Sequence, residues 1–248
     1  GGDVFGFVMR YENLEFREAL QQLAHRAGVT LPERSPQAGQ EKKVSEDLVR
    51  ISNFASKFYH KQLLNNSGPS TAALKYLHDR GLNDKTIESW EIGYAPDSFD
   101  ALIKALQAKE VTSVNALLAG VVAKNDRGNI FDRFRDRITF PIHNFYGDVV
   151  GFSARVMPGA KEDTAKYINS PETPIYSKSK ILFGLFQAKA AIRKMDEVVV
   201  VEGQMDTISA HQASFSNTVA TSGTAMTEDH LRLIGRLTKN IKFCFDSD

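Results

Sequence analysis

The sequence predicts an α+β part, made of helices and an antiparallel β-meander, followed by a partial α/β part with a parallel sheet. Three observations support this fold class. Apolar residues recur at helical spacing up to residue 119, and short strand-like runs separated by turn sequences begin after Gly128. From Glu197 onward, apolar strand-like runs alternate with helical patterns. The 248 residues are enough for one large domain or two ordinary ones.

The first part reads as a series of amphipathic helices. Residues 13–27 have helical spacing of apolar side chains, and Gly28 follows as a stop signal. The polar stretch 32–43 contains two prolines and a glycine, which predicts a linker between residues 1–31 and residues 44–195. Asn83 is the expected N-cap of one of the helices that follow. Those helices are expected at residues 44–63, 71–81, 84–90, 98–108 and 113–119.

After Gly128 the chain reads as a series of strands, which alternate with helices from Glu197 onward. Residues 138–142, 149–152 and 154–156 are separated by turn sequences, which favours an antiparallel meander. Val198-Val199-Val200-Val201 is a continuous apolar run, typical of a strand buried on both faces of a parallel sheet. A helix at 205–213, a strand at 217–221, a helix from the N-cap Thr227 through Leu237 and a strand at 241–245 complete the prediction.

The composition excludes several classes of protein. A hydrophobic fraction of 42% with 25% charged residues is that of a globular chain rather than a disordered one. The single cysteine, Cys244, excludes a disulfide framework and any Cys-based zinc site within these residues, and we expect it to be a small buried residue. We also expect Trp90 in the core. No apolar run approaches the roughly 18–20 residues of a membrane span, so we expect a cytosolic-type chain without membrane contact.

The chain carries 31 Lys and Arg against 30 Asp and Glu, but these charges are segregated. Residues 124–194 hold thirteen basic and seven acidic residues, a net charge of +6. The remaining 18 basic and 23 acidic residues give −5. A basic segment of this kind is the footprint of a surface that binds polyanions, although a solvated basic face would look the same.

Carboxylates follow two of the three strands of the predicted parallel sheet. Glu202 and Gly203 come after the first strand, and Asp246 and Asp248 come after the third. Because the carboxyl ends of parallel strands meet at one edge, these side chains should converge and bind Mg²⁺, which prefers oxygen ligands. Gly203 is expected to allow a sharp backbone turn there. The alternative is that these carboxylates merely cap the following helices.

Residues 198–248 resemble the first half of a Toprim domain, whose pattern is a Glu after the first strand and Asp-x-Asp after a later one. Other motifs resemble those of bacterial DNA primases: RFRDRITFPI at residues 133–142, KYINSPET at 166–173, YSK at 176–178 and LFGL at 182–185. Residues 1–28 resemble the end of that family's zinc-binding domain. Two features depart from the family: residues 151–155 lack its frequent glycine pair, and its further acidic motif is absent from this sequence. The start at Gly1 and the end beside a core strand suggest a fragment.

This resemblance implies the C-terminal end of a zinc-binding domain over 1–31, a primase core subdomain with a basic groove over 44–195, and a truncated Toprim domain over 196–248. It implies synthesis of RNA primers on a single-stranded DNA template from ribonucleoside triphosphates, in the bacterial cytoplasm at the replication fork. Glu202, Asp246 and Asp248 would be catalytic and hold Mg²⁺, with Mn²⁺ as a substitute. Zn²⁺ would be bound only upstream of Gly1, and the replicative helicase would bind a further C-terminal domain.

The resemblance places nucleic acid and nucleotide in the basic segment. Arginine suits phosphate contacts because its fork is planar and always charged. If residues 133–137 form a strand, their three arginines share one face and Phe134 packs behind; alternatively, Arg133 and Arg135 pair with neighbouring aspartates. Tyr167 is either a stacking surface for a base or ordinary core. The predicted contacts to nucleic acid or nucleotide come from Arg133, Arg135, Arg137, Arg155, Lys166, Tyr167, Asn169 and Lys178.

Two other functions remain open at this point. A Toprim nuclease or topoisomerase would use the same carboxylates, although nothing in the sequence marks the tyrosine nucleophile of a topoisomerase. A non-catalytic single-strand-binding module would use the basic segment alone, and its binding would weaken with salt but not depend on Mg²⁺.

Overall fold

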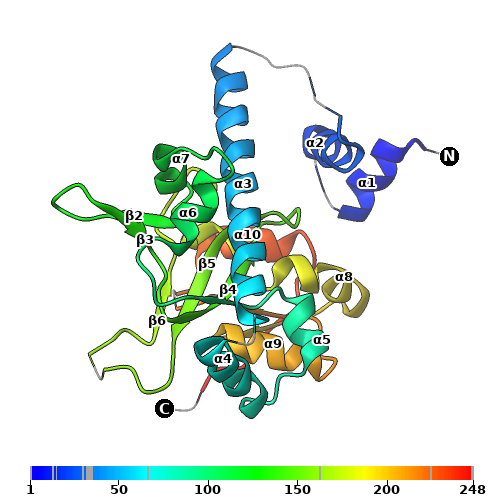
Figure 1. Cartoon of the computed structure of the whole chain (residues 1–248). Helices are drawn as coiled ribbons and strands as arrows, with labels where there is room; N and C mark the ends of the chain where they lie inside the picture. The colour runs from blue at the N-terminus through cyan, green and yellow to red at the C-terminus, as the bar shows by residue number, and fades with distance from the viewer. Residues whose placement is uncertain are drawn as a thin grey trace.

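A long helix, α3 (Pro36–Leu63), crosses the molecule and packs on a four-stranded antiparallel sheet (Figure 1). The computed structural model describes residues 2–12, 14, 16–29, 31, 36–65, 67–161, 163–223 and 225–246. In the antiparallel sheet, the strands lie in the order β1 (Gly93–Ala95), β4 (Arg137–His143), β5 (Val149–Val156) and β6 (Tyr167–Asn169). The predicted meander is confirmed, with residues 149–156 forming one strand rather than two.

The strand register gives this sheet two different faces. Ser153 lies opposite Asn169 and Arg155 lies opposite Tyr167 across the β5–β6 pair. Paired residues project to the same side of a sheet, and side chains alternate along each strand. Arg155, Tyr167 and Asn169 therefore share one face, while Phe152 projects to the other face and packs edge-on against Tyr59 of α3. The residues predicted to bind nucleic acid on these strands thus point away from α3.

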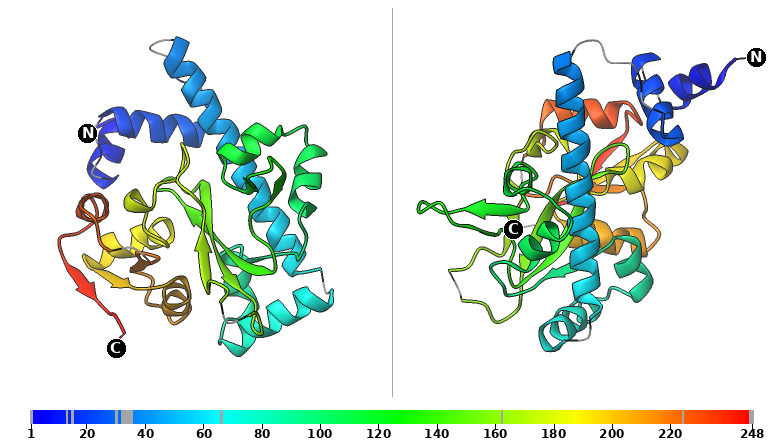
Figure 2. Two further views of the ribbon diagram at one scale, coloured as in Figure 1. Left: turned by 90° about the vertical axis from the view of Figure 1, so that its left-hand side faces the viewer. Right: turned by 45° about the horizontal axis from the view of Figure 1, so that its top comes forward.

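Short helices and a hairpin surround the sheet. The N-caps of two helices fit the sequence: the side chain of Asn83 accepts the Thr86 N–H at 2.9 Å, and that of Thr112 accepts the Asn115 N–H at 3.2 Å. The hairpin of β2 and β3 was not predicted, and it projects from the molecule (Figure 2). These elements are α4 (Gly68–Asp79), α5 (Asp84–Ser89), α6 (Ala101–Gln107), α7 (Ser113–Leu118), β2 (Val122–Lys124) and β3 (Ile130–Asp132).

The C-terminal part is the predicted parallel sheet. Its strand order is β8 (Thr218–Ala220), β7 (Val198–Val201) and β9 (Ile241–Phe243), and both pairings are parallel. Helix α9 (Gln204–Gln212) connects β7 to β8, and α10 (Glu228–Gly235) connects β8 to β9. Thr227 caps α10 as predicted, since its hydroxyl accepts the His230 N–H at 3.1 Å. Two elements before this sheet were not predicted: the 3₁₀ turn η1 (Lys178–Lys180) and α8 (Leu185–Met195).

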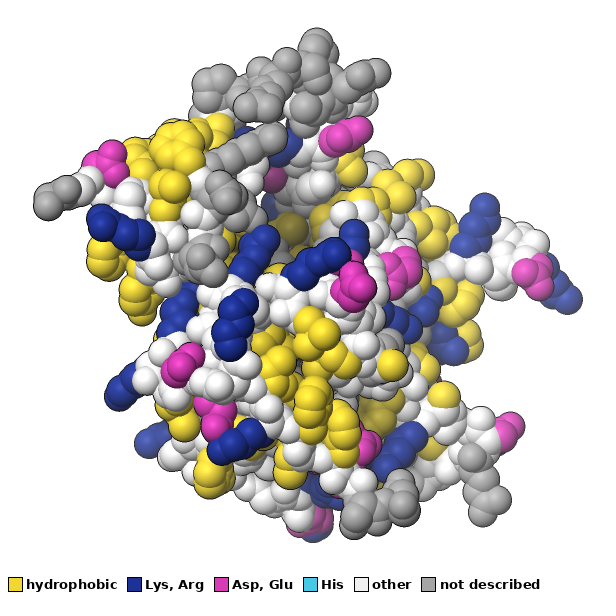
Figure 3. Space-filling view, turned by 180° about the vertical axis from the view of Figure 1, so that it is seen from behind, with side chains coloured by type: hydrophobic (Ala, Val, Ile, Leu, Met, Phe, Trp, Pro, Cys, Tyr) yellow, Lys and Arg dark blue, Asp and Glu magenta, His cyan; other side chains and the backbone are white. Residues whose placement is uncertain are grey.

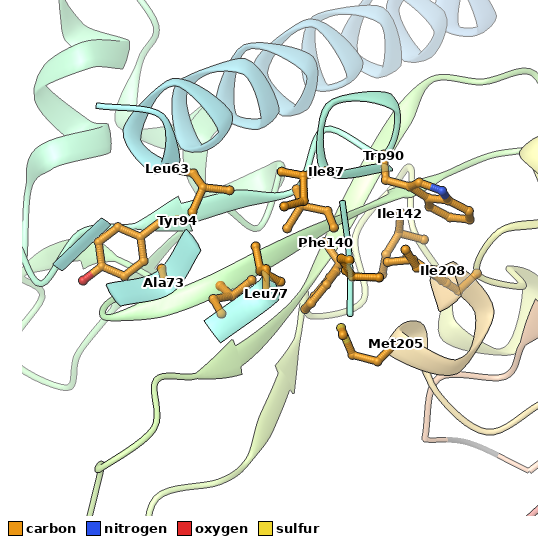
Figure 4. Close-up of a cluster of buried hydrophobic side chains, with 14 of the residues drawn as sticks. Leu63, Ala73, Leu77, Ile87, Trp90, Tyr94, Phe140, Ile142, Met205 and Ile208 are labelled. Carbon is orange, nitrogen blue, oxygen red and sulfur yellow. The ribbon is translucent and has the colours of Figure 1, made fainter. Parts of the chain in front are cut away.

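One apolar cluster joins the two sheets. It combines side chains from α3, α4 and β4 with side chains from α9, which point toward one another (Figure 4). Trp90 is buried, as predicted, and its ring stacks on Phe183 with 5.5 Å between centroids. Burying this cluster between the subdomains fixes the face of β5 and β6 relative to the parallel sheet.

The N-terminal helices α1 (Val4–Glu12) and α2 (Phe16–Ala27) form a small unit beside α8. The buried Glu12 carboxylate accepts a hydrogen bond from Arg193, and His25 lies 3.4 Å from an oxygen of Asp148. Apolar side chains gather on the surface over this unit (Figure 3). None of the helices in the described ranges is long and apolar enough to cross a membrane.

Two local predictions are wrong. Helix α3 begins at Pro36 rather than near Val44, so most of the stretch expected to be a linker is helical; proline is well tolerated in the first turn of a helix. Cys244 is exposed rather than buried, as are Phe243 and Phe245. The reason is that β9 lies at the edge of the described sheet, where no other element of the described chain covers it.

Candidate active site

Two predicted carboxylate positions meet at the carboxyl edge of the parallel sheet. The backbone N–H of Asp246 donates a hydrogen bond to Glu202 Oε1 at 3.1 Å. Glu202 directly follows β7, and Asp246 lies three residues beyond β9, so adjacent parallel strands end on adjacent acids. Both residues are exposed. Asp248 lies outside the described residues.

A third carboxylate, Asp206, lies beside Glu202. It occupies the first turn of α9, and its Oδ2 accepts the Gly203 N–H at 3.1 Å. Gly203 itself has an extended backbone, with φ −127°, so the expected sharp turn is not the reason for glycine here. A Cβ at this position would lie 2.9 Å from the Asp206 carboxylate, which is closer than real contacts allow. Gly203 thus leaves room for Asp206.

The donor atoms at this edge suit a hard divalent cation. Glu202, Asp206 and Asp246 offer carboxylate oxygens only, and Mg²⁺ prefers such ligands while retaining several waters. Among the residues described, no three acidic, histidine or cysteine side chains converge closely enough to form a protein-only metal cage. A Mg²⁺ ion at Glu202 and Asp246 would take its remaining ligands from water and phosphate oxygens.

On β5, Arg155 lies between two aromatic rings. Its guanidinium carbon is 5.0 Å from the centroid of the Tyr76 ring and 5.5 Å from that of Tyr167. Nη1 of Arg155 donates to the Tyr167 hydroxyl at 3.4 Å. Burial raises the pKa of Tyr167, and the nearby charge of Asp206 adds to that increase. Tyr167 therefore lies close enough to Asp206 for the carboxylate charge to act on its hydroxyl.

Arg133 and Asn169 complete the link between the two subdomains. Arg133 Nη2 donates to the Asn169 carbonyl at 3.4 Å, and the Asn169 side-chain amide donates to the Ser222 carbonyl at 3.2 Å. Ser222 follows β8 and has a positive φ of 59°, and this hydrogen bond joins its loop to β6. Four buried polar atoms here have no protein partner: Nε of Arg133, Nε of Arg155, Oδ1 of Asn169 and Oγ of Ser222. Buried polar groups require partners, so these atoms mark a place for a polar ligand or ordered water.

The prediction that residues 133–137 form a strand with three arginines on one face is wrong. Residues 133–136 form a bend, Asp136 has a φ of 47°, and β4 begins only at Arg137. Phe134 nevertheless packs inward, as expected, with 1% of its surface exposed. The bend separates the arginines, because alternation requires a continuous strand.

Arg135 and Arg137 therefore have different surroundings. The Arg135 guanidinium lies 4.3 Å from the ring centroid of Phe99, which is 66% exposed. Arg137 is buried, and its Nη1 donates to the carbonyls of Ala154 and Ala165 at 3.3 and 3.0 Å. Burial lowers the pKa of Arg137, and the neighbouring Arg135 lowers it further. Arg135 thus contributes to an exposed surface, whereas Arg137 ties β4 to the segment before β6.

The alternative ion pairs within this segment do not form. Asp132 is buried and accepts the backbone N–H groups of Leu102 and Ile103 at 2.7 and 3.0 Å, at the start of α6. Burial raises its pKa, while these hydrogen bonds oppose the increase. Asp136 accepts a hydrogen bond from the Tyr94 hydroxyl at 2.8 Å. Both aspartates make structural hydrogen bonds and do not pair with Arg133 or Arg135. The two guanidinium groups are therefore available to bind an anion.

The two lysines of the prediction lie on separate segments of the chain. Lys166 is exposed just before β6, and its carbonyl accepts the Val156 N–H at 3.0 Å. Lys178 begins η1, where its N–H donates to Glu172 at 2.9 Å. The ring of His230, which is fully buried, lies 3.0 Å from the Lys178 carbonyl and ties η1 to α10.

Sequence reasoning missed Asp206 and Phe99. The signal for Asp206 was available, since an acidic residue three positions after Gly203 is typical of the first turn of a helix. Nothing in the sequence distinguishes Phe99 from a core residue, because its exposure depends on the tertiary fold. Cavities of about 410 and 700 Å³ lie between α2 and α3 and contain none of the predicted site residues.

Comparisons with known proteins agree with this arrangement. Residues 58–189 match the family described as DNA primase catalytic core, N-terminal domain, and residues 199–248 match the Toprim-like family. A DNA primase of Deinococcus radiodurans is 43% identical over 249 residues, which is all of this chain and 41% of that protein. The chain thus spans about two fifths of the length of this curated relative.

Solved structures show the same fold. A DnaG primase catalytic domain bound to single-stranded DNA is 35% identical, with a TM-score of 0.75, and covers 84% of this chain and 65% of that chain. The zinc-binding and RNA polymerase domains of the Aquifex aeolicus primase are 31% identical, with a TM-score of 0.72, and cover 99% of this chain and 57% of that chain.

Proposed function

This chain belongs to the bacterial DNA primase family, and we propose that it forms much of the catalytic core of an enzyme that makes short RNA primers on single-stranded DNA. The reaction is nucleotidyl transfer from ribonucleoside triphosphates. Two hydrogen bonds carry this proposal: Glu202 meets Asp246 at the carboxyl edge of the parallel sheet, and Asn169, on the same face as Arg155, bonds to the loop after β8 at that edge. One edge can hold a cation, and the facing strands offer arginines to phosphates.

Each group has a distinct part in this proposal. Glu202 and Asp246, with Asp248, would hold Mg²⁺; Mn²⁺ would fit the same oxygen donors. The bound ion would neutralise charge on the triphosphate. Arg133 and Arg155 would contact phosphate oxygens, and Asn169 would donate or accept hydrogen bonds at the same place. Lys166, Lys178, Arg135 and Arg137 would complete the basic groove, with Arg137 acting through the backbone that it holds. Rate enhancement would come from positioning and charge stabilisation.

The test is primer synthesis by the full-length protein on a single-stranded template, with and without Mg²⁺. We expect labelled short RNA products that disappear when EDTA removes the cation and return when excess Mg²⁺ is added. Template affinity should persist in EDTA, because phosphate contacts by arginines do not need the cation. Template binding without any products at saturating Mg²⁺ would instead favour a non-catalytic binding module.

A Toprim nuclease or topoisomerase would use the same carboxylates and is not favoured by the family matches. Incubation with supercoiled plasmid separates this possibility from a primase. We expect the plasmid to remain supercoiled under the conditions that give primers. Relaxed or nicked plasmid at comparable rates would contradict the proposal.

The exposed pair of Phe99 and Arg135 gives a prediction about the template. A ring that is 66% exposed and flanked by a guanidinium offers a stacking surface for a base. We expect Phe99→Ala in the full-length protein to weaken binding of single-stranded DNA by roughly 5- to 100-fold. The measurement is fluorescence anisotropy with a labelled oligonucleotide.

Phe215→Ala is the matched control, since it removes a ring that is 61% exposed and that, among the described contacts, has no guanidinium over it. It should leave the affinity unchanged. Equal affinities for wild type and Phe99→Ala would exclude Phe99 from the template path.

The wider assignments follow from family membership. We propose that residues 1–31 end a zinc-binding domain whose Zn²⁺ ligands lie elsewhere in the protein. In support, the Aquifex structure that includes this domain covers 99% of the chain, against 84% for the catalytic domain alone. We also propose that the enzyme works in the bacterial cytoplasm at the replication fork, where a replicative helicase would bind a domain outside this chain.

A further inference from the structure

Tyr76 lies outside every motif recognised in the sequence, yet it contacts the candidate site. It belongs to α4, and its ring packs against the apolar cluster between the two sheets. The Arg155 guanidinium carbon lies 5.0 Å from the ring centroid of Tyr76 and 5.5 Å from that of Tyr167. A helix and a strand therefore present one aromatic ring each to the same cation.

The two rings hold Arg155 without neutralising it. Among the described residues, no ion pair involves Arg155, whereas Arg193 of the same segment pairs with Glu12. Its hydrogen bond to the Tyr167 hydroxyl is long, at 3.4 Å, and its Nε is buried without a partner. Aromatic faces attract a guanidinium but leave its N–H groups free, whereas a carboxylate would occupy them. Arg155 is thus fixed in place with its donors still available to an anion.

The hydroxyl of Tyr76 does not explain its position. That oxygen is buried and has no hydrogen-bond partner in the protein. A buried hydroxyl without a hydrogen-bond partner is unfavourable, so this group does not stabilise the fold. The ring alone makes the contact with Arg155, which means that phenylalanine should serve equally well.

We propose that Tyr76 is a positioning residue that holds the Arg155 guanidinium against Tyr167 so that its free N–H groups face a phosphate bound at the carboxyl edge. This inference rests on the proposed function, in which Arg155 contacts phosphate. The phosphate could belong to the incoming triphosphate or to the nucleic acid strand. Replacing Arg155 distinguishes them: a higher KM for ribonucleoside triphosphates indicates the triphosphate, and a higher Kd for the oligonucleotide indicates the nucleic acid strand.

The experiment compares variants of the full-length protein: Arg155→Ala, Tyr76→Leu and Tyr76→Phe, with Leu74→Ala as control. Leu74 also lies on α4 and packs against the same cluster, so it reports loss of packing alone. We measure KM for ribonucleoside triphosphates, Kd for a single-stranded oligonucleotide and kcat. Tyr76→Leu should raise the same constant that Arg155→Ala raises, by about 5- to 30-fold, with kcat nearly unchanged. Tyr76→Phe and Leu74→Ala should resemble the wild type.

A double variant completes the test. In the Arg155→Ala background, Tyr76→Leu should cause no further change, because the group it positions is gone. The inference is wrong if the double variant shows the product of the two single fold-changes. It is also wrong if Tyr76→Leu behaves as wild type while Arg155→Ala is impaired. In both cases the proposed function stands. A normal Arg155→Ala enzyme would instead remove the proposed role of Arg155. Should Tyr76→Leu unfold, Tyr76→Met keeps a similar volume without a ring and gives the same comparison.

Discussion

Replacing Glu202 with Gln in the full-length protein should reduce primer synthesis by at least about a hundredfold, because a cation at the active site supplies several kcal/mol of stabilisation to the transition state. Gln has nearly the same shape as Glu, and its carbonyl oxygen can still accept the Asp246 N–H that now bonds to Glu202. The substitution therefore removes the charge and leaves the edge of the sheet intact. Affinity for single-stranded DNA should stay within about twofold, since phosphate contacts dominate it.

Glu197→Gln is the matched control for this prediction. Glu197 directly precedes β7, at the opposite end from Glu202, and forms an ion pair with Lys242 at 2.6 Å. Removing its charge alters an ion pair worth about 0–1 kcal/mol and should leave synthesis unchanged. Normal primer synthesis by Glu202→Gln would mean that the Glu202 carboxylate holds no essential cation. The roles of Asp246 and Asp248 would not change that conclusion.

The adjacency of Glu202 and Asp246 could be predicted because it depends on a general rule. A continuous run of four valines indicates a central parallel strand, and parallel strands end at the same edge. The sequence also predicted the caps at Asn83 and Thr227, whose side chains do accept backbone N–H groups. These features are local or follow from the order of strands alone. For the same reason, the alternation of helix and strand after Glu197 is confirmed.

Features that depend on tertiary contacts were missed. The bend at residues 133–136 forms although its residues alternate as in a strand, because Asp136 bonds to Tyr94 and Asp132 caps α6. The exposure of Cys244 reflects the place of β9 at the sheet edge, which an apolar pattern does not reveal. Tyr76 joins the site only because its ring, on α4, meets Arg155 of β5. The assignment of the phosphate-binding residues and of the domain boundaries remains a prediction.

Phe134→Ala should lower the free energy of unfolding by about 3–5 kcal/mol and also weaken DNA binding, because one buried ring supports both the core and the basic bend. Phe134 is 1% exposed, and its ring lies 6.4 Å from that of Tyr59 and 5.9 Å from that of Phe152, edge-on in both cases. Arg133 and Arg135 flank it in the chain. Without the ring, the bend loses its packing against α3 and β5 and keeps only the hydrogen bonds of Asp132 and Asp136, so the flanking arginines should be less well oriented.

Urea denaturation measures the change in the free energy of unfolding. Fluorescence anisotropy with a labelled oligonucleotide, in the absence of urea, measures the change in DNA affinity. The control is again Phe215→Ala, an identical deletion at a position that is 61% exposed, which should change the unfolding free energy by no more than about 0.5 kcal/mol. A loss of stability with unchanged DNA affinity would separate the two roles and show that the arginines are oriented by other contacts. A loss of less than about 1 kcal/mol would contradict the packing argument itself, since truncating a fully buried Phe leaves a cavity that its neighbours fill only in part.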